Sequence, residues 1–360
     1  MIISSVLAAC IAFCGNADAQ QNTRLSPAQQ QTVQQLVDEL RGVNFTDACG
    51  IDIRFLTESG GRNIDPILVG RNLVFCQDWL ARLRDRSITG PQFRRFRDTL
   101  DDVYDAFADF LGRPPRRGEK IFVNVNKDIS RRSDRTTTTR TEGHAHPAYN
   151  VICVPPHTRL WINVIRSNDI MPFTEIHEIA HTFSVQAPRH WVAETETVAN
   201  WLTSYAVEKL DFRLCYNPSM RTSISFFDGR LTDARIDHPD LQIFRGTQYR
   251  AFEFNKAHAN FRRGVHTMPK WAKASYEDGS AYAYIMFGLP NRVGWEAIAQ
   301  AVRSYNDSNF VQTRSFQGDR QNVMVHNFLY RVAHFSNRKD DLLWQDAVIV
   351  VNHHFPVTVQ

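Results

Sequence analysis

The sequence predicts an α+β fold that is mainly helical with a small mixed sheet, because two kinds of hydrophobic periodicity follow each other along the chain. Apolar residues recur every three or four positions within the first hundred residues and again from about Asp169 onward, as in amphipathic helices. Between these regions, short runs alternate with a period of two, as in strands. An order of helices, a small sheet and further helices is typical of an α+β protein.

The composition is that of a folded globular protein with one large or two moderate domains. The chain has 360 residues, of which 43% are hydrophobic and 22% are charged, and this argues against a disordered or fibrous protein. The formal net charge of +4 is small for this length, and no basic stripe interleaved with aromatic residues is present. We therefore expect no nucleic-acid partner.

Residues 1–19 have the pattern of a signal peptide. An uncharged apolar run at residues 2–14 precedes Ala17-Asp18-Ala19, a small-x-small cleavage pattern, although the run has no Lys or Arg before it. The run is too short to span a bilayer as a mature helix, so we expect no stable membrane insertion after its removal. Residues 7–10 resemble a lipobox, which leaves a lipid anchor as an alternative. We expect a secreted, periplasmic or extracellular protein.

Cysteine usage agrees with export. Without the signal segment four cysteines remain: Cys49, Cys76, Cys153 and Cys215. An even number in an exported chain favours disulfides, and four thiols allow three pairings among which the sequence does not choose. Four buried free thiols are the alternative. No CxxC pair is present, which argues against a structural zinc ribbon.

Residues 20–115 are expected to form an N-terminal helical region, either a propeptide or part of the fold. Ser26-Pro27 is a typical helix start, with a capping residue followed by proline in the first turn. Helical periodicity predicts one helix from there to about Leu40 and two more at residues 72–84 and 91–111.

Residues 116–360 are expected to form a second region, with a sheet part at 116–190 and a helical part at 191–350. Alternating apolar residues predict strands at 121–125, 149–154 and 160–165. The stretch 215–270 is rich in loop-forming residues. Helical spacing elsewhere predicts helices at 172–184, 192–210, 276–288, 292–305, 322–335 and 340–347.

The helix predicted at 172–184 contains an HExxH motif formed by His177, Glu178 and His181. Residues four apart lie on one face of a helix, with about 5–6 Å between Cβ atoms. Two imidazoles at that spacing can bind one zinc ion at about 2.0–2.1 Å. Glu178 projects about 100° around the helix, from where it can reach a metal-bound water. The motif therefore predicts one Zn²⁺ per chain.

This arrangement suits hydrolysis of a peptide bond. Zinc lowers the pKa of its bound water and polarises the scissile carbonyl, while Glu178 takes the proton as general base and passes it to the leaving amine. We therefore predict a zinc metallopeptidase. Tyr282 and Tyr284 are candidates to stabilise the oxyanion, although both also fit a helix core.

Zinc requires a third protein ligand, which we expect to be Glu196. A histidine six residues after His181 is excluded because Ala187 occupies that position, and no GTxD string is present. Glu194 and Glu196 both lie on the next predicted helix. Asn200, four residues after Glu196, can hydrogen-bond the other ring nitrogen of a ligand histidine and thereby orient it. A solvated helix face is the alternative for both glutamates.

HEIAH at 177–181 followed by ETVAN at 196–200 resembles the gluzincin metallopeptidases, and most closely the enhancin-like, mucin-degrading family. That family has a short spacer and a tryptophan, here Trp191, before Glu-x-x-x-Asn, and it usually has glycine where Ala180 stands. The resemblance implies a zincin-like fold, with the sheet above the active-site helix and an edge strand that pairs with extended substrate. Residues 160–165 are the edge-strand candidate.

The leading hypothesis is therefore a secreted zinc endopeptidase that acts on extracellular proteins or glycoproteins. An aminopeptidase is a second hypothesis and would need an acidic anchor such as Glu175 or Glu194 for the free amine of its substrate. A third is an exported zinc-binding or interaction module without turnover. The sequence leaves open the cleavage preference, the disulfide pairing and the oligomeric state.

Overall fold

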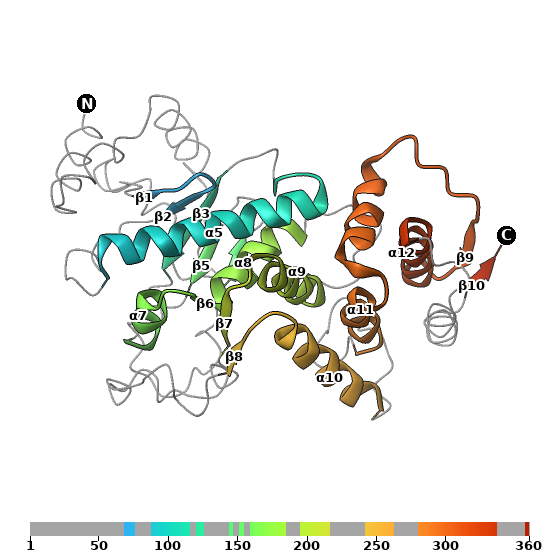
Figure 1. Ribbon diagram of the computed structural model, residues 1–360. Helices are drawn as coiled ribbons and strands as arrows, with labels where there is room; N and C mark the ends of the chain where they lie inside the picture. Colours follow the sequence, from blue (N-terminus) through green and yellow to red (C-terminus); the bar gives the residue numbers. More distant parts are fainter. Residues whose placement is uncertain are drawn as a thin grey trace, which may run out of the picture. The chain divides into compact units, whose positions relative to one another are not determined.

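A computed structural model of the chain (Figure 1) describes a mainly helical protein with small sheets. The expected signal peptide, the helix predicted from Ser26 and the helix predicted at 340–347 lie outside the described residues. The described elements divide into two compact units. The structure describes residues 68–75, 88–115, 120–125, 144–146, 151–154, 159–184, 195–216, 242–262, 280–336 and 357–359.

The larger sheet belongs to the first unit and is mixed, as predicted. Its strand order is β1-β2-β3-β5-β4, in which β2, β3 and β5 run parallel and the edge strands β1 and β4 are antiparallel to their neighbours. The strand predicted at 121–125 is β3, and the one predicted at 149–154 is β5. The strands are β1 (Leu68–Val69), β2 (Leu73–Phe75), β3 (Ile121–Val125), β4 (His144–His146) and β5 (Val151–Val154).

Helix α5 (Gly90–Leu111) connects the parallel strands β2 and β3, as a crossover between parallel strands requires. It starts at a capping box, in which Thr89 N–H donates to Gln92 Oε1 at 2.9 Å and Gln92 N–H donates to Thr89 Oγ1 at 3.4 Å. Its buried apolar residues recur at helical spacing, which confirms the helix predicted at 91–111. Phe93 packs edge-to-face on Phe75 of β2, with ring centroids 5.2 Å apart.

The turn between β1 and β2 is fastened to α5 by the buried carboxylate of Asp101. This carboxylate accepts the backbone N–H groups of Arg71 and Asn72, each at 2.8 Å. A Cβ atom at Gly70 would collide with the same carboxylate, so the position requires glycine. Burial raises the pKa of the Asp101 carboxyl, and the two backbone hydrogen bonds partly oppose that shift.

A second, three-stranded sheet also belongs to the first unit, and it follows helix α7 (Arg159–Arg166). Strand β7 pairs in parallel with β6 and antiparallel with β8. Beside the β6–β7 pair, Arg213 donates to both carboxylate oxygens of Asp169, at 2.7 and 2.6 Å. The strands are β6 (Ile170–Pro172), β7 (Arg213–Tyr216) and β8 (Gln242–Phe244).

The chain between β6 and β7 contains helices α8 (Phe173–Ser184) and α9 (Thr195–Leu210). Helix α8 begins directly after β6, and α9 ends two residues before β7. Asp211 ends α9 in a left-handed conformation with φ of 51°, a common way for a helix to terminate. The start of α8 and the end of α9 are therefore joined to neighbouring strands.

Among the described residues, the second unit contains the end of α5 from Asp105 onward, helix α9, and the helices and small sheet of the C-terminal part. Its core is an aromatic cluster in which the Phe110 ring lies 5.3 Å from that of Trp201, 4.6 Å from Tyr205 and 5.9 Å from Trp295. The other elements are α10 (Gln248–Arg262), α11 (Ser280–Arg303), η7 (Ser304–Asn306), β9 (Phe316–Gly318), α12 (Arg320–Ser336) and β10 (Val357–Val359). None of the helices among the described residues combines the length and apolar character needed to cross a membrane.

Two predicted elements are wrong. Residues 160–165, expected to be an edge strand, lie in helix α7, with Ile162, Val164 and Ile165 buried. Such a short apolar run fits either structure by periodicity alone. Residues 73–75, expected to begin a helix, form strand β2, which is completely buried between β1 and β3 and therefore lacks an alternating pattern.

Asp101→Ala should lower the free energy of unfolding by about 2–4 kcal/mol, because it removes a charged acceptor from two partly buried backbone N–H groups. Urea unfolding measures the change. Asp102, the neighbour of Asp101, is the matched control, because it is half exposed and pairs with Arg71 at the surface. Asp102→Ala should change the free energy by less than about 1 kcal/mol. Equal losses in the two variants would contradict the anchoring role of Asp101.

Candidate metal centre

Helix α8 is buried along nearly its whole length and yet contains four ionisable side chains. Glu175 is 0% exposed, Glu178 5% and His177 8%, while His181 is half-buried. Removing such groups from water is unfavourable unless a partner compensates for the lost hydration. A buried helix with this composition therefore marks a candidate functional site.

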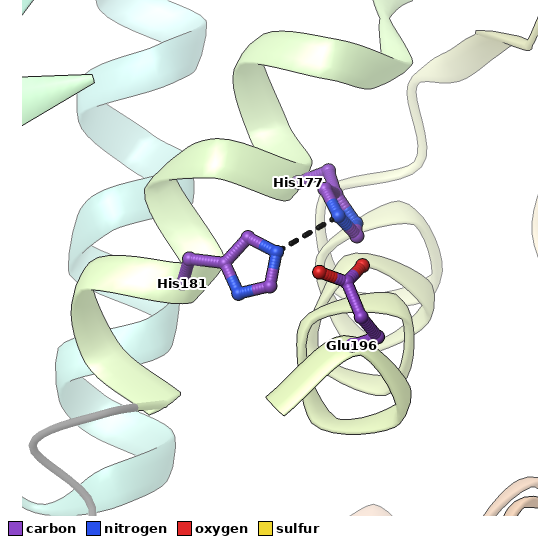
Figure 2. Close-up of side chains that lie close together, drawn as sticks. All are labelled: His177, His181 and Glu196. Carbon is purple, nitrogen blue, oxygen red and sulfur yellow. Dashed lines mark hydrogen bonds between the residues drawn. The ribbon is translucent and has the colours of Figure 1, made fainter. Parts of the chain in front are cut away.

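His177 and His181 lie one turn apart on α8 with their ring nitrogens facing each other (Figure 2). Their Nε2 atoms are 3.0 Å apart, and the two rings are nearly perpendicular, with centroids separated by 4.6 Å. Zinc binds imidazole nitrogen at about 2.0–2.1 Å, so one ion can contact both Nε2 atoms at this separation. The sequence predicted this pair.

Aromatic packing holds the His177 ring. Phe173, the first residue of α8, lies against this imidazole with ring centroids 4.9 Å apart. Phe173 also meets Tyr216 of β7 edge-to-face, with ring centroids 4.9 Å apart. Phe173 thus contacts both the His177 imidazole and the end of β7, and this packing helps to orient the imidazole.

Glu196 in the first turn of α9 completes the group. The ligand atoms of His177, His181 and Glu196 all lie within 4.8 Å of one another, and Figure 2 shows the carboxylate beside the two imidazoles. Two imidazole nitrogens and one carboxylate oxygen form a donor set that suits zinc. Among the described residues no other three His, Cys, Asp or Glu side chains meet in this way. Glu194 lies outside the described residues.

The remaining predicted site residues lie on the same two helices. Glu178 follows His177 directly and is buried. Asn200 is half-buried on α9, and its amide oxygen accepts a hydrogen bond from the Tyr249 hydroxyl at 3.2 Å. Sequence reasoning did not assign Tyr249 to the site, because no motif or spacing relates it to α9.

The sequence also offers Glu175 as an anchor for a substrate amine and Tyr282 and Tyr284 as oxyanion stabilisers. Glu175 is completely buried, which argues against a role as an accessible anchor for a substrate amine. Tyr284 stacks on Phe254 of α10 with ring centroids 4.9 Å apart. The side chain of Tyr282 lies outside the described residues.

Cys215 does not take part in the expected disulfide pairing, because it is a buried free thiol on β7. It packs in a small cluster with Val164, Ile170 and Ile243, where a thiol fills space as an apolar side chain does. Burial, and to a smaller extent the nearby Glu175 carboxylate, raises the pKa of the thiol to about 12. Cys49 and Cys76 lie outside the described residues.

Cys215 should resist alkylation by iodoacetamide at about pH 8 in the native protein and react after unfolding, because only a thiolate attacks the reagent. Peptide mass spectrometry measures the modification. The native state retains the thiol proton between pH 9.0 and about 12, so the free energy of unfolding should fall as pH rises through that window. Cys215→Val should remove this part of the slope. Rapid labelling of Cys215 in the folded protein would contradict its burial.

Comparisons with protein-family models, with curated proteins and with solved structures found no match to this chain.

Proposed function

We propose that this chain is a secreted zinc metallopeptidase of the gluzincin type that hydrolyses peptide bonds in extracellular proteins or glycoproteins. One observation supports the proposal above the others. On the buried helix α8 the Nε2 atoms of His177 and His181 lie 3.0 Å apart, with the Glu196 carboxylate within 4.8 Å of them. Export is proposed from the pattern of residues 1–19, which precedes the described part of the chain.

The number of protein ligands favours catalysis over a purely structural metal site. Structural zinc sites usually use four protein ligands, whereas catalytic sites use three and leave one position for water or substrate. Among the described residues, His177, His181 and Glu196 are the three side chains placed to act as ligands, and two histidines with one glutamate is a donor set known in zinc peptidases. An interaction module without turnover would have no need of the open position.

The residues divide the reaction between them. His177, His181 and Glu196 would hold the ion. When bound, zinc supplies Lewis acidity, which makes water a stronger nucleophile near neutral pH and polarises the scissile carbonyl. Glu178 accepts the proton of the attacking water as general base and delivers it to the leaving amine as general acid. Its burial excludes bulk water from the carboxylate and strengthens its electrostatic interactions.

We further propose a zincin-like fold in which β4 takes the substrate-pairing role first expected of residues 160–165. Strand β4 is an edge of the five-stranded sheet, and among the described strands it pairs only with β5. An extended peptide can add to such an edge through backbone hydrogen bonds. Recognition of this kind suits an endopeptidase that accepts internal segments of a chain.

Glu178→Gln should lower kcat for casein or mucin hydrolysis by about 10²–10⁴-fold while the zinc content stays unchanged, because the variant lacks only the general base. Glu296→Gln, an exposed residue of α11, is the matched control and should retain full activity. Product analysis by mass spectrometry distinguishes internal cleavage from release of N-terminal residues. If the zinc-loaded wild-type protein hydrolyses neither substrate, the proposed peptidase activity is contradicted and a zinc-binding module is favoured. Release of N-terminal residues alone would favour an aminopeptidase.

A further inference from the structure

Tyr249 bonds to helix α9 one turn beyond the candidate metal ligand Glu196. Its side chain is 0% exposed, and its hydroxyl donates to Asn200 Oδ1 at 3.2 Å. Asn200 follows Glu196 by four residues, so the two side chains lie on the same face of α9. The buried phenol therefore contacts the residue that neighbours the ligand along that face.

The next residue of α10, Arg250, bonds to α9 at a second point. Arg250 is 4% exposed, and its guanidinium donates to both carboxylate oxygens of Glu208, at 2.5 and 3.2 Å. Trp295 of α11 donates to the same carboxylate at 2.9 Å, and Arg250 also donates to Asn291 at 2.8 Å. The first turn of α10 thus holds α9 near the ligand-bearing end and again two turns farther on.

These two attachments differ in what they control. The Arg250–Glu208 pair is charged and largely shielded from water, so removal of either partner would leave an uncompensated charge and destabilise the fold. The Tyr249–Asn200 bond is neutral, and its loss leaves the aromatic ring in place. An asparagine amide presents an acceptor at one end and two donors at the other, and the partners of the amide decide which end faces which neighbour. The Tyr249 hydroxyl therefore sets the orientation of the Asn200 amide.

We propose that Tyr249 is a positioning residue of the metal centre, which acts by holding Asn200 and thereby the face of α9 that presents Glu196. This inference rests on the zinc site of the proposed function and assigns it a supporting residue on a third helix. Groups that orient metal ligands typically contribute about 10–100-fold to metal affinity. Tyr249 should contribute in that range without touching the ion.

The test is zinc affinity by chelator competition in the purified full chain. Tyr249→Phe should weaken zinc binding by about 10–100-fold, and Asn200→Ala should weaken it by a similar factor. Because Tyr249 acts through Asn200, the double variant should bind zinc no more weakly than the weaker of the two single variants. The thermal midpoints of the zinc-free proteins should nearly coincide, since the ring at position 249 is retained.

Tyr330→Phe is the matched control. Tyr330 lies on α12, which contributes no candidate ligand, and its hydroxyl pairs with Thr313 Oγ1 at 2.7 Å. Its zinc affinity should stay within about twofold of wild type. Three outcomes would each overturn the inference. Tyr249→Phe could bind zinc with wild-type affinity, or the losses of zinc affinity in the double variant could be additive. The thermal midpoint of the zinc-free variant could also drop far enough to explain its weaker zinc binding. If zinc binding needs Tyr249 but the wild-type protein hydrolyses no substrate, the inference about Tyr249 holds and the proposed peptidase activity is contradicted. A wild-type protein that binds no zinc would overturn both.

Discussion

The parallel pairing of strands β6 and β7 brings together the two ends of the segment that contains all three candidate ligands. Helix α8, with His177 and His181, starts where β6 ends, and helix α9, with Glu196, ends just before β7 begins. The register pairs Ile170 with Arg213 and Pro172 with Cys215, and the bidentate Asp169–Arg213 ion pair supports it. Since a parallel pair needs a long crossover, this connection also provides the room for two helices.

Burial sets the electrostatic character of α8. Two histidines and two glutamates within seven positions of a buried helix are costly to keep unless hydrogen bonds or a cation compensate for the lost water. A divalent ion bound by the facing imidazoles and Glu196 would provide that compensation, and it would be held most strongly where water is excluded. Glu196 lies in the first turn of α9, where the helix dipole also favours a carboxylate.

Local patterns were predictable from the sequence, whereas contacts between distant segments were not. His177 and His181 could be paired because a spacing of four residues decides their geometry within one helix. The helix at 91–111 could be predicted because its apolar spacing is equally regular. The prediction of a strand at 160–165 was wrong because so short, mostly apolar a run suits a strand or a helix equally well. Its packing as helix α7 decides between the two. Strands β7 and β8 and the Tyr249–Asn200 bond were missed because they join segments separated by dozens of residues with no motif. Helix α10 was missed because its apolar residues do not gather on one face, so it lacks the periodicity that reveals a helix.

X-ray absorption at the zinc edge of the purified, zinc-loaded protein tests the central claim most directly. The account predicts one zinc per chain with two imidazole nitrogens at about 2.0–2.1 Å, carboxylate oxygen at about 2.0–2.2 Å and a further light-atom ligand from water. His181→Ala should lose the ion and Glu178→Gln should keep the same spectrum. A spectrum with sulfur ligands, a shell closed by four protein groups, or a protein that retains no zinc would contradict the account.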